Sequence, residues 1–249
     1  MRKKIAKLLF ALILTITLSI TFSVNAATSK TVNNQSELKE ALNDSSISTI
    51  ILGSDIETTE KINIMRPVTI DGANHTIKYV GTFGSSNSNT VWGGIYVLQV
   101  YKTEATIKDI KLTGGNAALL INGSTVTLEG KIDVSGNGFG GIELGKGSNI
   151  DTAPYLILGD NSEIINTTES SDRPTIWVPA DTDGAMIEID GIRFDLEKGE
   201  ELTLQEINDL ANSVENPETN DPIILHITFL ILTVILSSYA IKKFTSKED

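Results

Sequence analysis

Apolar residues two positions apart, separated by polar residues, recur through the middle of the chain. This period of two is typical of a β-strand with one buried face. The runs are only three to five residues long and are separated by Gly, Asn, Asp and Ser, which favours tight turns over helices. We therefore predict short strands whose inward-facing pairs are Val68 and Ile70, Ile110 and Leu112, Val126 and Leu128, Ile132 and Val134, and Ile142 and Leu144.

The stretch from Val68 to Ser148 reads as one unit written three times. When residues 107–124 are laid over residues 128–148, apolar pairs and turn glycines coincide at a step of 21 to 24 residues. A short period of this kind indicates a solenoid, in which each repeat is covered by its neighbours. The short strands and the step predict an all-β fold, a single-stranded parallel β-helix over residues 27–198.

Two helices are predicted, one on each side of the strands. Residues 34–43 begin with Asn34 and Glu37 in capping-box spacing and carry a one-sided apolar stripe, which is typical of a short helix that covers an open end. Residues 199–215 contain a second capping box, Thr203 and Glu206, before another apolar stripe. This second segment is interpreted as a cap for the far end, with the start of a stalk as the alternative.

Both ends of the chain carry targeting patterns. Residues 1–26 have a basic start, an apolar core and a small-residue ending at Ala26, which predicts a cleaved secretory signal peptide; an uncleaved membrane anchor is the alternative. Residues 223–241 form a second apolar run, followed by lysines, and are long enough for a transmembrane helix. We expect an exported protein that is tethered at its C-terminus, with the membrane as a partner of the apolar run.

The segment before the apolar run is Asn216-Pro217-Glu218-Thr219-Asn220. An NPxTN pentapeptide, an apolar helix and a lysine-containing tail resemble the sorting signal of Gram-positive cell-wall proteins, over residues 216–249. The resemblance implies cleavage after Thr219 by a sortase and attachment to peptidoglycan. The departure from the commoner LPxTG pattern leaves the sortase class open, and a plain membrane anchor is the alternative.

Three internal segments carry a second resemblance: TIILGSDIETTEKINI, PVTIDGANHTI and SGNGFGGIEL. They are similar to the right-handed parallel β-helix of the pectate-lyase-like superfamily, with its capping helix, from Val32 to about Ile192. The resemblance implies a right-handed solenoid. Its motifs concern the fold and leave the activity open.

One repeat is longer than the others, because 37 residues separate Ile70 from Ile107. The excess includes a Gly/Ser/Asn-rich insertion, Gly81 to Thr90, and Asn166 to Arg173 form a second loop. Loops on a rigid scaffold often bind ligands, and aromatic rings suit carbohydrates. The alternative is that the rings cover the base of the insertion. The candidate binding residues are Tyr79, Phe83, Trp92, Tyr96 and Tyr101.

Net charge and composition limit the classes of partner that the protein could bind. The formal net charge is -12, and removal of the four basic residues of the signal peptide would make it -16. Nucleic acid and anionic lipid are therefore disfavoured as partners. The chain has no cysteine, so the core has to stabilise the exported protein without disulfides.

No catalytic residues and no cofactor are assigned, because family-like motifs are absent and His75 is the only histidine outside the apolar run at residues 223–241. Asp71, Asp109 and Asp133 are interpreted as bonding to backbone in turns. Asp181-Thr-Asp183-Gly184 resembles the opening of a calcium loop but lacks the later ligands, so a structural calcium ion stays open while no metal ligands are assigned.

Three functions are compared. The preferred one is adhesion by a surface-anchored protein that binds a glycan or a host or neighbouring cell surface without catalysis. The alternative is an extracellular polysaccharide lyase or glycoside hydrolase. A third, ice binding, would need T-x-T on successive repeats, and only Thr125-Val-Thr127 fits.

Overall fold

A computed structural model describes residues 28–82, 95–147, 149–159 and 161–215. This part of the chain is all-β in character: it is mostly strands in parallel pairing, with two helices among the described residues. No helix within it is long and apolar enough to cross a membrane. The predicted signal peptide, sorting signal and transmembrane helix lie outside the described residues.

The larger sheet, here called the first sheet, has β1 at one edge and β16 at the other. Three further strands, β3, β6 and β13, pair with members of this sheet at its side. In order across the sheet, the strands are β1 (Thr28–Val32), β2 (Ile47–Leu52), β5 (Val68–Asp71), β8 (Glu104–Thr113), β10 (Thr125–Asp133), β12 (Tyr155–Leu158), β15 (Met186–Ile189) and β16 (Ile192–Asp195). The side strands are β3 (Ile56–Thr58), β6 (Thr76–Tyr79) and β13 (Glu163–Ile165).

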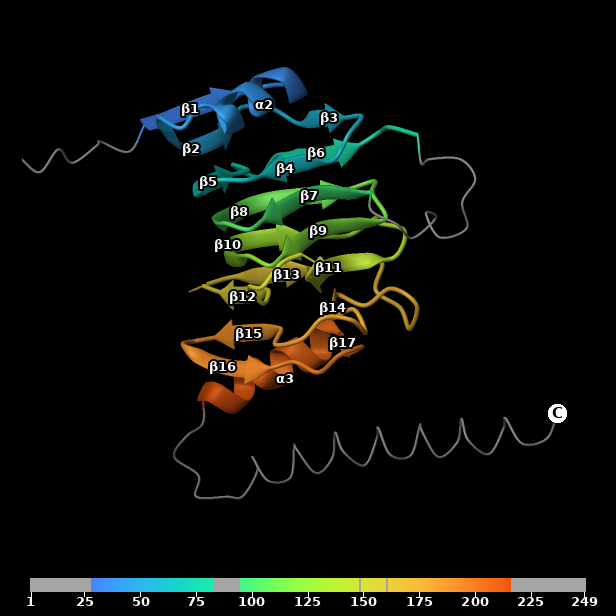
Figure 1. Cartoon of the computed structure of the whole chain (residues 1–249). Helices are drawn as coiled ribbons and strands as arrows, with labels where there is room; N and C mark the ends of the chain where they lie inside the picture. Colours follow the sequence, from blue (N-terminus) through green and yellow to red (C-terminus); the bar gives the residue numbers. More distant parts are fainter. Residues whose placement is uncertain (1–27, 83–94, 148, 160, 216–249) are drawn as a thin grey trace, which may run out of the picture.

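The second sheet has six strands, and the chain visits it between visits to the first sheet. In Figure 1 the successive layers of strands run down the molecule, from β1 and β2 at the N-terminal end to β15, β16 and β17 at the other end. In order across the sheet, they are β17 (Glu201–Leu202), β14 (Ile176–Trp177), β11 (Gly140–Gly145), β9 (Ala117–Asn122), β7 (Tyr96–Tyr101) and β4 (Ile62–Ile64).

The register shows how much chain each repeat uses. Ile70 pairs with Ile107, Ile107 with Leu128, Leu128 with Leu158, and Leu158 with Ile189. These steps are 37, 21, 30 and 31 residues long. The long step from Ile70 is confirmed, but the expectation of a single long repeat is wrong, because two later repeats also carry extra chain.

The ten residues predicted to face inward are all buried, none more than 6 % exposed. They belong to one continuous apolar cluster that runs from Val32 in β1 to Ile207 near the far end. Complete burial of a Val, Leu or Ile side chain contributes about 1.5–3 kcal/mol, so this cluster dominates the stability of the stack.

Strands β8 and β10 are longer than the three to five residues expected, because each continues around a corner of the stack. At the corner, Asp109 has φ 47° and Gly130 has φ 63°, and the register between the two strands shifts between Glu129 and Ile132. The Asp109 carboxylate accepts a hydrogen bond from the backbone N–H of Lys131, at 3.1 Å. A β-bulge bends the chain here without ending the strand.

Helix α2 (Gln35–Asn43) lies against β1 and β2 at the N-terminal end of the stack (Figure 1). Its predicted N-terminal cap is confirmed: the Asn34 side chain accepts from the backbone N–H of Glu37, at 3.0 Å. The Glu37 carboxylate reaches back to the N–H of Asn33, at 2.8 Å, one residue earlier than in a standard capping box. The buried side of the helix consists of Leu38, Ala41 and Leu42.

The parallel pairing does not continue to the C-terminal end. Strands β15 and β16 pair antiparallel, and so do β14 and β17. Helix α3 (Leu204–Glu215) follows, and its Ile207 is buried in the main apolar cluster. The Glu169 carboxylate, from the second predicted loop, accepts a hydrogen bond from the backbone N–H of Leu204, at 2.7 Å, and so caps this helix.

Candidate functional site

The five aromatic residues predicted to bind a ligand do not form one exposed surface among the described residues. Tyr79 is 6 % exposed and Tyr96 is 9 % exposed, whereas Tyr101 at the end of β7 is half-buried. Phe83 and Trp92 lie outside the described residues. The burial of Tyr79 and Tyr96 favours the alternative, in which these rings cover the base of the insertion.

Tyr96 belongs to a second apolar cluster, which lies on the side of the second sheet away from the main core. Trp177 is part of it, and Phe139 packs edge-on against Trp177 with the ring centres 4.7 Å apart. A Cβ atom on Gly140 would lie 3.1 Å from the Trp177 ring, so glycine lets the ring lie close to the strand. The sequence analysis missed Phe139 and Trp177; the signal was an aromatic residue next to Gly140 and another in β14. The cluster consists of Tyr96, Ala117, Leu120 and Trp177.

Two ionisable side chains are partly buried beside this cluster. Burial raises the pKa of the Glu143 carboxyl, and the negative charge of Asp181 adds to the rise; a hydrogen bond from the Tyr96 hydroxyl, at 2.6 Å, acts in the opposite direction. Burial lowers the pKa of Lys61, whose ammonium group donates to the Gln99 side chain at 2.5 Å. Glu143 is thus biased towards its neutral form.

The variant Glu143→Gln is expected to melt at a higher temperature than the wild type at pH 7. Because the pKa is raised in the folded state, the neutral carboxyl stabilises the fold below the ordinary pKa of about 4.3, and this stability is lost as the pH rises through the folded-state pKa. Glutamine keeps the neutral form at every pH and can still accept from Tyr96. Melting curves at pH 7 and pH 3.5 test this.

We expect the difference between Glu143→Gln and the wild type to disappear at pH 3.5. Glu201→Gln is the matched control, because Glu201 is exposed and lies two strands away in the second sheet. Glu143 pairs with Trp177, and Trp177 pairs with Glu201. An equal melting temperature for Glu143→Gln and the wild type at pH 7 would contradict the prediction.

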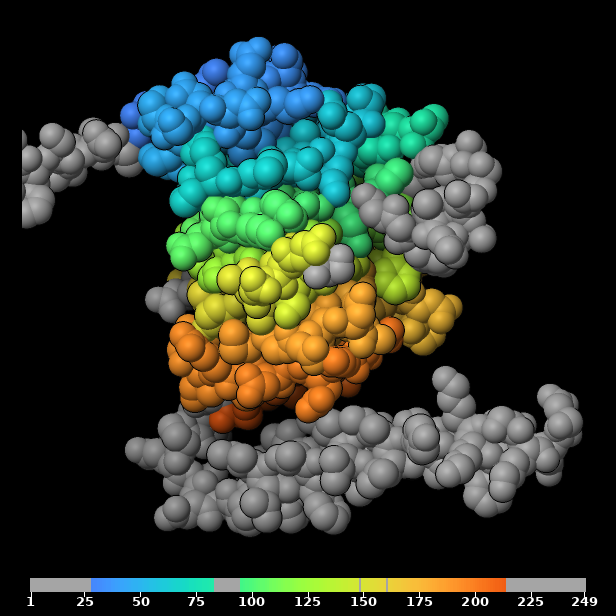
Figure 2. Space-filling model, in the orientation of Figure 1, coloured from blue at the N-terminus to red at the C-terminus, as the bar shows by residue number. Residues whose placement is uncertain are grey.

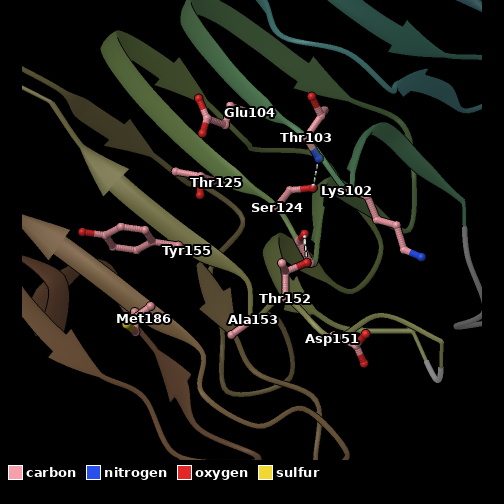
Figure 3. Close-up of a pocket in the computed structure, with 11 residues that line it drawn as sticks. Lys102, Thr103, Glu104, Ser124, Thr125, Asp151, Thr152, Ala153, Tyr155 and Met186 are labelled. Carbon is pink, nitrogen blue, oxygen red and sulfur yellow. Dashed lines mark hydrogen bonds between the residues drawn. The ribbon is translucent and has the colours of Figure 1, made fainter.

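A groove of about 550 Å³ lies at a different place, where strands of the second sheet lead into strands of the first (Figure 3). The connections from β7 to β8 and from β9 to β10 form its floor, and the connection from β11 to β12 forms a wall. The sequence analysis did not predict it. Its lining residues are Lys102, Thr103, Glu104, Gly123, Ser124, Thr125, Asp151, Thr152, Ala153, Tyr155 and Met186.

The wall exists because the connection between β11 and β12 folds back over the two preceding repeats. The Thr152 hydroxyl donates to the carbonyl of Gly123, at 2.7 Å, and the Lys102 ammonium group donates to the carbonyl of Asn149, at 3.0 Å. Gly123 has φ 55°, and a Cβ atom there would lie 2.2 Å from the Ile150 side chain. In Figure 2 the yellow segment that contains this connection lies over the green layers.

One side of the groove is a column of outward-facing residues at the beginning of successive strands. Glu104 in β8 pairs with Thr125 in β10, Thr125 with Tyr155 in β12, and Tyr155 with Met186 in β15. Figure 3 shows these four side chains at successive levels. Neighbouring strands are about 4.8 Å apart, so the column presents carboxylate, hydroxyl, ring and thioether groups at regular intervals.

The Tyr155 ring is held in place from outside the groove. Its hydroxyl donates to the Glu188 carboxylate, and the Arg193 guanidinium lies 5.0 Å from the ring centre. Arg193 also donates to Glu188, at 3.0 Å. Both hydrogen bonds lower the pKa of the Glu188 carboxyl, and the one from Tyr155 has the larger effect. The ring therefore has one preferred orientation before any ligand arrives.

The turn aspartates hold the backbone, which confirms their interpretation. The Asp71 carboxylate accepts from the backbone N–H of Ala73, at 2.9 Å, and contacts the Lys108 ammonium at 3.1 Å. The Asp133 carboxylate accepts from the backbone N–H of Ser135, also at 2.9 Å. Burial alone would raise the pKa of the Asp133 carboxyl. Hydrogen bonds from Lys111 and Ser135, together with the positive charge of Lys111, outweigh burial and lower this pKa.

One residue of the segment that resembles the opening of a calcium loop forms an ion pair. The Asp183 carboxylate forms an ion pair with Lys198, at 2.6 Å. Within the described ranges, no group of three or more His, Cys, Asp or Glu residues is arranged to hold a metal ion.

The first sheet carries one column of outward-facing threonines, which the sequence analysis did not recognise. Its members pair in register from β2 to β10: Thr49, Thr69, Thr106 and Thr127. The neighbouring outward column on one side is mixed: Ile51, Asp71, Lys108 and Glu129. The column on the other side is mixed as well, because Thr125 pairs with Glu104 and with Tyr155. The two parallel threonine columns that an ice-binding surface of T-x-T repeats would need are therefore not formed by these strands.

One family model matches the chain. It is described as "Putative pectate lyase-like adhesive domain" and covers residues 29–140, which run from β1 to the start of β11. The chain is thus similar to this adhesive family over the first repeats, including the floor of the groove. Neither a curated protein nor a solved structure matches the chain.

Proposed function

We propose that this protein is a cell-surface adhesin that binds a surface or glycan without catalysis. The observation that carries the proposal is the match of residues 29–140 to a pectate lyase-like adhesive domain. The parallel sheets supply a rigid scaffold, and the extra chain in three repeats supplies the loops and the groove that can vary without disturbing the core.

The scaffold of the proposed adhesin is a single-stranded right-handed parallel β-helix with helical caps. Alternate visits of the chain to the two sheets, with strands paired in chain order, support a solenoid. A stack that grows along one axis would project its far end away from the cell, which suits a protein that bridges two surfaces.

The proposed location is the outer face of a Gram-positive cell. Residues 1–26 would direct export, a sortase would cleave after Thr219 and join the chain to peptidoglycan, and residues 223–241 would hold it in the membrane until then. The support for this step is the order of the three C-terminal parts in the sequence.

A gain-of-adhesion experiment tests the function. We expect a non-adherent Gram-positive strain that expresses the full chain to be retained on glycan-coated surfaces or on animal-cell layers several-fold better than the same strain without it. Glycan-coated surfaces of neutral, amine-bearing and uronic-acid type separate the ligand classes. Equal retention of the two strains on every surface would contradict adhesion.

The alternative function is a polysaccharide lyase or glycoside hydrolase. One observation favours it: Glu143 is a partly buried carboxyl whose raised pKa suits a general acid. Turnover of uronate or neutral glycans by the full chain, tested with and without calcium, and its loss in Glu143→Gln would replace adhesion by this activity.

A further inference from the structure

We propose that the groove between Lys102 and Met186 binds a short segment of an uncharged glycan, with one pyranose ring against Tyr155. This inference rests on the proposed adhesive function and assigns it a site and a class of ligand. The groove volume of about 550 Å³ lies within the 300–1,000 Å³ that is usual for ligand sites.

Tyr155 provides the contact with the apolar face of a sugar ring. Its hydroxyl is held by Glu188 and the Arg193 guanidinium lies over one face of its ring, so little side-chain entropy is lost on binding. An aromatic ring buries a large apolar area, and Tyr155 lies in the outward column that lines the groove. A pyranose presents a matching apolar face of C–H groups.

Hydroxyl groups provide the polar contacts. Thr103, Thr125 and Thr152 line the groove from three different segments, and each hydroxyl can both donate and accept. Within the described residues, the Thr103 and Thr125 hydroxyls have no hydrogen-bond partner, while Thr152 donates to Gly123 and can still accept. Such groups match the mixed donors and acceptors of sugar hydroxyls better than they match a charged group.

The charges favour an uncharged ligand. Two acidic residues, Glu104 and Asp151, and one basic residue, Lys102, line the groove, so its lining is net negative. The Lys102 ammonium group also already donates to the carbonyl of Asn149. The whole chain has a formal net charge of -12. A polyanionic glycan would therefore meet repulsion both in the groove and at longer range.

The floor of the groove is rigid. Ser124 is buried; its hydroxyl donates to the carbonyl of Val100, at 3.0 Å, and accepts from the backbone N–H of Thr103, at 3.2 Å. The two connections of the floor are thus tied to each other. A site whose parts are already fixed loses less free energy on binding than a mobile loop would.

The test measures binding of the purified full chain, in detergent micelles, to three hexasaccharide probes: a neutral hexose, an N-acetylhexosamine and a uronate. We expect at least one of the two uncharged probes to bind and the uronate to bind at least about tenfold more weakly. The variant Tyr155→Ala should weaken binding at least about tenfold, equivalent to about 1.4 kcal/mol. Thr125→Val should weaken it less, because it removes one hydroxyl at nearly constant shape.

Three controls make the result decisive. Thr69→Val changes a threonine in the same sheet outside the groove and should leave affinity unchanged, and Phe139→Ala probes the cluster on the second sheet. Melting curves show that each variant is folded; if Tyr155→Ala unfolds, Tyr155→Leu takes its place, since it fills the space without the ring. Saturation-transfer NMR on the sugar protons should lose the ring contact in either variant.

The outcomes separate the site from the function. Unchanged affinity in folded Tyr155 and Thr125 variants, or loss only in Phe139→Ala, would overturn the groove while adhesion to glycan stands. Preference for the uronate would overturn the ligand class. No binding of any probe, although cells that express the chain adhere to animal-cell layers, would overturn the glycan site but not adhesion; loss of adhesion on every surface would overturn the proposed function itself.

Discussion

Replacement of Asn137 by alanine is expected to lower the free energy of unfolding by about 3 kcal/mol. Asn137 is 3 % exposed, and its side chain bonds three backbone groups in two adjacent repeats. Its carbonyl oxygen accepts from the N–H of Gly115 at 2.9 Å, and its amide donates to the carbonyls of Leu112 at 3.0 Å and Val134 at 2.8 Å.

The large effect follows from what alanine would leave behind. Each buried backbone group without a partner costs about 1–3 kcal/mol, and three such groups would lose theirs together, with partial relief if water enters. Chemical denaturation of the full chain, followed by circular dichroism in the far ultraviolet, measures the change. The matched control is Asn63→Ala in β4, where the asparagine is exposed and the expected change is within about 0.5 kcal/mol.

Asn137→Asp refines the test, because aspartate keeps the acceptor for Gly115 but loses both donors. We expect it to destabilise the fold at least as much as alanine at pH 7, since it also buries a charge. Equal unfolding free energies for Asn137→Ala and Asn63→Ala would show that these three bonds contribute nothing to holding the repeats together.

The inward-facing residues could be predicted because a strand with one buried face has a fixed period. Val68, Ile70 and the other predicted pairs are all buried, and Ile70 pairs with Ile107 as the long step requires. The capping role of Asn34 was predictable for a similar reason, since the hydrogen bond involves only neighbouring residues.

The groove could not be predicted, because it depends on contacts between distant parts of the chain. Residues 149–152 fold back onto Lys102 and Gly123, which the sequence places 29 to 47 residues earlier. The one local signal was Gly123 itself, whose positive φ and missing side chain make room for Ile150. A glycine after Asn122 also suits an ordinary turn, so the signal was ambiguous.

Two of the five candidate aromatic residues, Tyr79 and Tyr96, are buried for a physical reason. Large aromatic side chains bury well, so an aromatic residue beside an insertion fits a packed base as readily as a binding face. Tyr96 illustrates the first case, since it lies in the cluster with Trp177 and donates to Glu143. Tyr155 would be the second case in the proposed groove: its ring lies in the outward column, whereas its neighbours in sequence, Pro154 and Leu156, are buried.

Replacement of Thr219 by alanine is expected to abolish the covalent attachment of the protein to the cell wall. In the proposed sorting signal the sortase cleaves after Thr219 and joins its carbonyl carbon to peptidoglycan. Alanine at this position would disrupt the pentapeptide that the sortase recognises. Residues 223–241 would still hold the chain in the membrane. The protein should move from the murein fraction to the detergent-soluble membrane fraction. Muramidase digestion followed by immunoblotting of both fractions measures the shift.

Thr245→Ala is the matched control, because Thr245 lies beyond the apolar run, among the terminal lysines, and is no part of the pentapeptide. We expect it to be attached to murein like the wild type. If Thr219→Ala is also attached to the same extent, the pentapeptide is not a sorting signal, and the apolar run would then have to anchor the adhesin alone. That outcome would leave the groove unaffected, because the anchor and the described stack are separate parts of the chain.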